Sequence, residues 1–332
     1  MKRLYGTIII LFLILTYAFL QESHPKKNDK NRTPIVGILQ LTDHPALNEI
    51  HKGIIDGLKE SGYFPNKNIK IDFQNAEGNQ SNLQTMSTKF ANENVDAAIG
   101  IATPAAQSLA NSIKNAPIVL GAITDPEKAG LVDSNQHPGR NVTGVSDLLP
   151  LQPNLDLIKA SVPHLKNLGI IYTSSDNSST TQYQMFKKLC KENHINLKAY
   201  TIANSNDLNQ VSQQMLQKVD AVFVPVDNTI ASSIQTLIGN ANSKNIPVFP
   251  GSDTMVKAGG VATYTVDQYG MGVQTGKMMA GILRGQIDPK NTPISFTKHP
   301  KLVVNLKQAQ KLGIHLPENI IQEATHKGVI YK

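Results

Sequence analysis

Short polar motifs stand where apolar runs of the sequence give way to amphipathic stretches. One of them, Thr103-Pro104, lies at the end of the run 96–103. Thr is favoured just before the first turn of a helix and Pro at the first helical position, so helix capping alone accounts for this pair. The same position presents free backbone N–H groups and the Thr hydroxyl, which suit a ligand carboxylate. Capping and carboxylate binding are therefore two open interpretations of Thr103 and Pro104.

Carboxylates occupy the equivalent points of the second half of the chain. Asp227-Asn228 follows one apolar run, and Ser252-Asp253 follows the next. A buried ligand ammonium needs a carboxylate partner, because an unpaired buried charge is costly. Asp253 is our first candidate for that partner and Asp227 the second, with helix capping as the alternative role of both.

Three further motifs complete the candidate site. Thr124-Asp125 is a turn signal that is equally compatible with a ligand contact. Asp43-His44 follows the first apolar run, and a His in such a position is more often a solvated loop residue than a ligand contact. Asp147 is expected to make a hydrogen bond at the hinge. The complete set of predicted ligand-binding residues is Asp43, His44, Thr103, Pro104, Thr124, Asp125, Asp227, Asn228, Ser252, Asp253 and Tyr264.

Other kinds of chemistry have no support in the sequence. It contains no P-loop, nucleophile elbow, HExxH motif or Gly-rich dinucleotide fingerprint, and its His residues lack metal-ligand spacing. We therefore expect no enzyme activity, no metal and no cofactor. The net charge of +7 comes from scattered Lys and Arg without a helix-turn-helix or zinc-finger pattern, which argues against nucleic acid and suits an anionic cell envelope.

The elements that position these motifs follow from the alternation of β-branched runs with amphipathic stretches, which is typical of βαβ units and parallel sheets. In the first half the expected strands are 34–41, 70–76, 96–103, 118–124 and 141–147, and the expected helices are 46–61, 81–93 and 104–113. The second half repeats this order with strands 168–174, 196–202, 220–226, 247–252 and 261–267 and helices 179–194, 206–218 and 228–243.

The repeat predicts an α/β fold of two doubly wound parallel-sheet lobes joined by a hinge. Ligands of such sheets bind outside the carboxyl ends of the strands, so loops of both lobes are expected to line one cleft. The expected domains are lobe 1 at 34–148 with 268–290 returning to it, and lobe 2 at 149–267 with 291–332 returning to it.

The N-terminus has the residue pattern of an export signal. Met1-Lys2-Arg3 precedes an uncharged apolar run, so residues 1–22 predict a signal peptide or an uncleaved membrane anchor, and the polar segment 23–33 predicts a tether. The single cysteine, Cys190, lies too far along the chain to carry a lipid anchor and excludes an intramolecular disulfide. We expect an extracytoplasmic protein attached to the outer face of the cell membrane.

Several longer segments resemble a known family. They are ILQLTDHPALNEIHKGIIDGLKESGY at 38–63, IGIATPAAQSLAN at 99–111, AITDPEKAGLV at 122–132, NVTGVSDLLP at 141–150 and PVFPGSDTMVKAGGVATYTVDQYGMGVQTGKMMAGILRG at 247–285. Together they are similar to the ABC-transporter substrate-binding proteins related to the streptococcal tryptophan-binding lipoprotein, which have the type I periplasmic-binding fold. The missing lipid-anchor cysteine is a departure from that pattern.

The resemblance implies a monomeric protein that binds an amino acid, with aromatic, tryptophan-like ones favoured, and delivers it to an ABC permease and its ATPase. Two alternatives remain open: a membrane-anchored sensor, and a binder of another small solute such as a nucleoside or a sugar. A repressor with the same core would carry a DNA-binding helix-turn-helix where this chain has its apolar run. Ligand contacts from both lobes are expected to close the hinge.

Overall fold

The computed structural model describes residues 32–297 and 300–332. The chain divides into two compact units, Met1–Thr33 and Pro34–Lys332, and the second unit holds the elements described below. The predicted signal peptide or anchor at 1–22, and the predicted tether up to residue 31, lie outside the described residues. Within the described ranges, none of the helices combines the length and the apolar character that a membrane crossing requires.

The first sheet contains six parallel strands in the order β11-β5-β4-β3-β1-β2. The strands are β1 (Ile35–Gln40), β2 (Lys70–Asn75), β3 (Ala97–Ile101), β4 (Ile118–Gly121), β5 (Val142–Ser146) and β11 (Ser295–Phe296). Every residue of β3, β4 and β5 is buried, as expected for parallel strands with helices on both faces. The five strands predicted for the first half are thereby confirmed.

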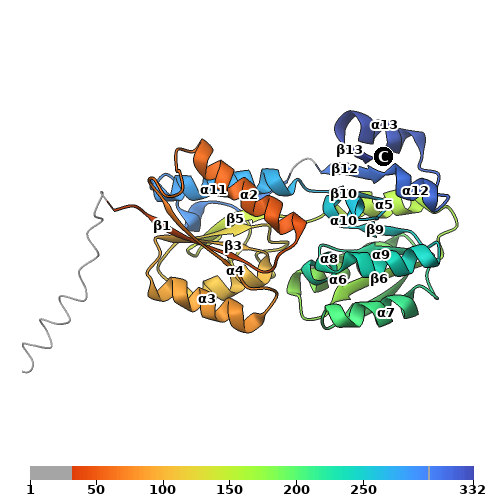
Figure 1. Cartoon of the computed structure of the whole chain (residues 1–332), viewed down its shortest axis with the longest axis horizontal. Helices are drawn as coiled ribbons and strands as arrows, with labels where there is room; N and C mark the ends of the chain where they lie inside the picture. Colours follow the sequence, from red (N-terminus) through yellow and green to blue (C-terminus); the bar gives the residue numbers. More distant parts are fainter. Residues whose placement is uncertain (1–31, 298–299) are drawn as a thin grey trace, which may run out of the picture. The chain divides into compact units, whose positions relative to one another are not determined.

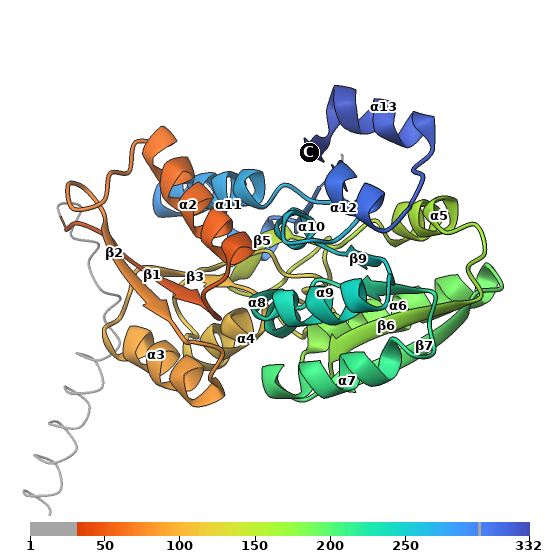
Figure 2. The same ribbon diagram turned by 45° about the vertical axis from the view of Figure 1, so that its right-hand side comes forward.

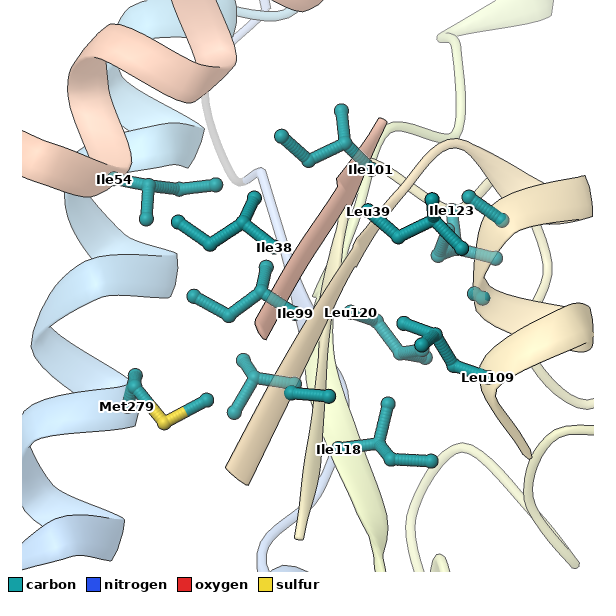
Figure 3. Close-up of a cluster of buried hydrophobic side chains, with 14 of the residues drawn as sticks. Ile38, Leu39, Ile54, Ile99, Ile101, Leu109, Ile118, Leu120, Ile123 and Met279 are labelled. Atoms are coloured by element: carbon teal, nitrogen blue, oxygen red, sulfur yellow. The ribbon is translucent and has the colours of Figure 1, made fainter. Parts of the chain in front are cut away.

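Helices cover both faces of this sheet (Figures 1 and 2). They are α2 (Pro45–Glu60) and α11 (Gln268–Leu283) on one face, and α3 (Gln80–Asn92) and α4 (Thr103–Ser112) on the other. Figure 3 shows the resulting core: Ile38 and Ile99 point towards α2 and α11, whereas Leu39 and Leu120 point towards α4. The core is mainly aliphatic, with Phe90 also buried in it, which agrees with the 5% aromatic content of the chain.

The contact between α2 and α11 depends on glycine. Gly53 and Gly57 of α2 face Gly272 and Gly276 of α11, and a Cβ atom built on any of the four would overlap backbone atoms of the other helix. Two helices with small residues four apart approach until their backbones touch, as in GxxxG pairs. This contact fixes residues 268–283 on the first sheet although more than 100 residues separate them from β5.

The second sheet contains four parallel strands in the order β7-β6-β8-β9. The strands are β6 (Asn167–Thr173), β7 (Asn196–Ile202), β8 (Ala221–Val224) and β9 (Val248–Pro250). Its helical elements are α5 (Leu151–Ser161), α6 (Asn177–Glu192), η1 (Ser205–Asp207), α7 (Leu208–Met215), α8 (Asn228–Ser232), α9 (Ile234–Ser243) and α10 (Asp253–Lys257). The single helix predicted at 228–243 is two helices, because the chain leaves helical geometry at Ser233.

The prediction that 261–267 forms a fifth strand of the second parallel sheet is wrong. Val261 donates a backbone hydrogen bond to the carbonyl of Val248 in β9, but β10 (Ala262–Thr265) then pairs antiparallel with β12 (Lys301–Asn305). A third sheet of order β10-β12-β13 results, with β13 (Val329–Tyr331) at its edge. β12 is a nearly fully buried strand that supplies the pairing partner, and it lies too far along the chain for strand periodicity to show it.

The C-terminal part of the chain divides between the two sheets. α11 and β11 join the first sheet, so the segment associated with it runs past the predicted end at residue 290 to Phe296. Between them lies η2 (Pro289–Asn291). α12 (Leu306–Lys311) and α13 (Glu318–Lys327) pack with β12 into the core of the second lobe. Figure 1 shows α13 near the C-terminus, beside the third sheet.

Candidate functional site

A cavity lies where the carboxyl ends of the strands of the two lobes meet. The space in it that protein atoms leave unfilled is about 510 Å³, a figure that includes space open to solvent. The lining residues are His44, Ala46, Leu47, Ile50, Ala102, Thr103, Ala122, Asp147, Ser178, Val226, Asp227, Asn228, Ala231, Ser252, Met255, Val266, Gln268 and Met271. Both lobes therefore supply its walls.

The first lobe contributes the ends of β3 and β4. Ala102 and Ala122 directly follow these strands and have φ angles of 74° and 61°, a region that non-Gly residues rarely adopt. Such strain is held in place by the surrounding structure and clusters at binding sites. The N-cap of α4 is Ala102, which makes no side-chain capping bond, so the capping role predicted for Thr103 is wrong. Thr103 is the first helical residue, and it lines the cavity.

Asp227 lines the cavity from the second lobe, but its carboxylate already accepts four hydrogen bonds from the protein. It is 1% exposed and accepts hydrogen bonds from the Thr173 N–H and hydroxyl at 2.6 and 2.9 Å, from the Ser179 hydroxyl at 2.8 Å and from the Ile230 N–H at 2.9 Å. The last bond caps α8. Asp227 therefore has a clear structural role as the group that joins β6, α6 and α8.

Asp147 is a buried carboxylate that can accept further hydrogen bonds. It is 7% exposed, lines the cavity and accepts one side-chain hydrogen bond, from the Thr124 hydroxyl at 2.9 Å. Burial raises its pKa to about 6. Nearby Asp176, the N-cap of α6, has a pKa raised to about 7 by burial and by the negative charges of Asp227 and Asp147. Three carboxylates, Asp147, Asp176 and Asp227, therefore influence one another in this region.

Hydrogen bonds cross from one lobe to the other at the cavity. His44 Nε2 lies 2.9 Å from Asn228 Oδ1, and the hydroxyls of Thr124 and Ser178 are 2.5 Å apart. Because Thr124 has one hydroxyl proton and donates it to Asp147, Ser178 is the donor in the second bond. Burial lowers the pKa of His44, which favours the neutral ring, and its Nδ1 atom is buried without a partner.

The rest of the cavity is an aliphatic wall. Leu47 and Ile50 of α2, Met271 of α11 and Met255 of α10 provide its bulk. α2 and α11 are the helices held together by the glycine contact, so that contact also positions this wall. Met side chains are flexible and make favourable contacts with aromatic rings, so the wall suits a flat apolar group.

The structure brings five of the predicted ligand-binding residues to the cavity: His44, Thr103, Asp227, Asn228 and Ser252. The other six do not line it: Asp43, Pro104, Thr124, Asp125, Asp253 and Tyr264. Several of these have other partners: Asp43 accepts from Asn48, Asp125 pairs with Lys128, and the Tyr264 hydroxyl donates to Glu323.

Asp253, the first candidate for an ammonium partner, is the first residue of α10 after its N-cap Ser252. It is partly buried, and Oδ1 accepts a hydrogen bond from the Gln268 amide at 3.1 Å in the orientation that satisfies that amide. Sequence reasoning missed Ser178 and assigned Asp147 to the hinge alone. Both follow strand ends, of β6 and β5, so the rule applied to the other motifs would have included them.

Comparison of the chain with known proteins identifies related sequences and structures. A family model described as ABC transporter substrate binding protein matches residues 35–327. The chain is 34% identical over 280 residues to the tyrosine-binding protein of Clostridioides difficile, covering 84% of this chain and 81% of that protein. Among solved structures, an ABC domain from Streptococcus pneumoniae in complex with L-Trp has 41% identity and a TM-score of 0.87, covering 91% of this chain and 100% of that one.

A third relative has a lower TM-score. The ligand-free, open structure of a substrate-binding protein with adhesive properties from Clostridium difficile has 32% identity and a TM-score of 0.69, covering 90% of this chain and 99% of that one. The family match and these identities extend over nearly all of the second compact unit. This chain belongs to the family of ABC transporter substrate-binding proteins.

Proposed function

We propose that this substrate-binding protein captures an aromatic amino acid in the inter-lobe cavity and delivers it to an ABC permease. The observation that carries the proposal is that one cavity contains both a buried carboxylate that can accept further hydrogen bonds and an aliphatic wall. An amino acid offers an ammonium to the first and a side chain to the second. The relatives support an aromatic side chain, since one is a complex with L-Trp and another is named a tyrosine-binding protein.

The contacts change the assignment of the ammonium partner. Asp253 does not line the cavity, and the oxygens of Asp227 already accept four hydrogen bonds. Asp147 lines it and accepts one side-chain hydrogen bond. We therefore propose Asp147 as the partner of the ligand ammonium. Thr103, at the start of the ten-residue α4, is our proposal for the carboxylate side.

We further propose that the lobes close on the ligand. Inter-lobe hydrogen bonds, among them His44 to Asn228 and Ser178 to Thr124, support a closed arrangement of this chain. The higher TM-score against the L-Trp complex than against the ligand-free, open structure agrees with it. A ligand shifts such an equilibrium only if it binds the closed state more tightly, which contacts to both lobes provide.

Proteins of this family act outside the cytoplasm, and we propose that this one is held at the membrane by residues 1–22 through the tether 23–33. The charged start and uninterrupted apolar run support this. Protease added to wall-free intact cells should digest the protein, and protection under those conditions would contradict the proposal. We also propose that the protein releases its ligand unchanged, without catalysis.

Calorimetric titration of the purified full-length protein tests the ligand assignment. L-Trp and L-Tyr should bind, whereas glycine and L-Ala, which lack a side chain to fill the aliphatic wall, should bind far more weakly. At a hundred times its dissociation constant a ligand stabilises a folded protein by about 2.7 kcal/mol, so a thermal shift should accompany binding. Binding of a nucleoside or sugar with no response to aromatic amino acids would contradict the proposal.

A further inference from the structure

We propose that the cavity recognises the ammonium group of its ligand far more strongly than the carboxylate, so that primary amines with an aromatic group and no carboxylate also bind. This inference rests on the proposed function, since it concerns the same cavity. It extends the expected ligands from amino acids to the amines that amino acid decarboxylation produces.

The charges around the cavity are the first reason. Among the residues that the structure describes, the charged ones lining the cavity are Asp147 and Asp227, and none is Lys or Arg. A third buried carboxylate, Asp176, lies near enough for its pKa to be raised by both. A ligand carboxylate in this cavity therefore meets negative charge without a basic partner, whereas an ammonium meets favourable charge from several sides.

The unpartnered nitrogen of His44 is the second, independent reason. His44 is 5% exposed and lines the cavity, and its Nε2 lies 2.9 Å from the acceptor oxygen of Asn228. Nε2 therefore carries the proton in the neutral ring, which leaves Nδ1 as a buried acceptor without a donor. Burial lowers the pKa of His44 and so keeps the ring neutral. An N–H donor on the ligand satisfies this acceptor, whereas a carboxylate does not.

The donors available to a carboxylate are few, which is the third reason. Pro104, in the first turn of α4, has no N–H group, and the N–H of Ala106 already donates to the Ala102 carbonyl. The Ser178 hydroxyl donates across the lobes to Thr124. The Ser252 hydroxyl accepts from the Met255 N–H and lies 3.1 Å from the Thr254 hydroxyl. The side-chain donors that remain are the Thr103 hydroxyl and the NH₂ group of Asn228, whose oxygen bonds His44.

A matched ligand series tests the inference. Calorimetry on the full-length protein would compare tryptophan, tryptamine, which lacks the carboxylate, and indole-3-propionate, which lacks the ammonium. We expect tryptamine to bind within about tenfold of tryptophan and indole-3-propionate at least a hundredfold more weakly. Tighter binding of indole-3-propionate than of tryptamine would overturn the inference. Tryptamine binding without tryptophan binding would support it while contradicting the proposed amino acid function.

Variants attribute the effect to the cavity. Asp147→Asn should weaken tryptophan and tryptamine by similar factors, of at least tenfold, and leave indole-3-propionate unchanged or improved. Asp156→Asn is the control, because Asp156 is exposed and accepts a hydrogen bond from Gln152 on the same helix. Equal weakening of all three ligands by Asp147→Asn would overturn the inference. The ligand series on the unaltered protein decides the question even if that variant fails to fold.

Discussion

Replacing Asp147 by Asn should stabilise the ligand-free protein and weaken its ligand binding. The pKa of Asp147 is raised from 3.8 to about 6 by burial. The pKa in the folded state lies above the pKa in the unfolded state, so ionisation of Asp147 lowers the free energy of unfolding as the pH rises from about 4 to about 6. The full loss of stability is present above both pKa values. At about 1.4 kcal/mol per pKa unit the loss is about 3 kcal/mol. Asn is neutral, and its amide oxygen retains the bond from Thr124, so most of this loss should be recovered.

Chemical denaturation of the ligand-free protein at pH 7.5 should therefore show a free energy of unfolding about 1–3 kcal/mol higher in Asp147→Asn. Calorimetry should show amino acid binding weakened by about 2–4 kcal/mol, as for loss of one partner of a buried charge pair. Asp253→Asn is the matched comparison and should leave binding nearly unchanged. If Asp147→Asn destabilises the protein, or if Asp253→Asn abolishes binding instead, the assignment of Asp147 is wrong.

Three further predictions follow from individual contacts. Gly57→Ala should destabilise the protein by about 1–3 kcal/mol in chemical denaturation, because the new methyl group meets the Val273 backbone, whereas Gly239→Ala, in open space within α9, should be neutral or stabilising. Asp227→Asn should cost about 2–3 kcal/mol in the same assay, because the new NH₂ group replaces an acceptor among four donors. Amino acid affinity should fall below about pH 6 as Asp147 becomes protonated, with proton release on binding seen as buffer-dependent calorimetric heats. A pH-independent affinity, or unchanged stability in the first two variants, would contradict these arguments.

The positions of most strands along the chain, and the expectation that polar residues at their ends line a cavity, could be predicted from the sequence, because both depend on local patterns. Fully apolar runs such as those around Ile99 and Phe223 are typical of parallel strands, and polar residues after them lie at the carboxyl edge of a sheet. The pairing of β10 with β12 could not be predicted, because it depends on a strand nearly 40 residues further along.

The choice between Asp147 and Asp253 also lay beyond the sequence. Both carboxylates follow a strand, and only the placement of the two lobes decides that Asp147 lines the cavity while Asp253 does not. The same holds for the glycine contact of α2 and α11. Its two pairs of glycines are more than 200 residues apart. Each pair alone indicates only two positions of low helix propensity.

A crystal structure of the protein with L-Trp or L-Tyr is the most direct test of the central claim. The amino acid should lie in the inter-lobe cavity, with its ammonium nitrogen about 3 Å from an Asp147 carboxylate oxygen and its ring against the aliphatic wall of Leu47, Ile50, Met255 and Met271. A ligand bound outside this cavity, or an ammonium paired with Asp253 while Asp147 contacts no part of the ligand, would contradict the account.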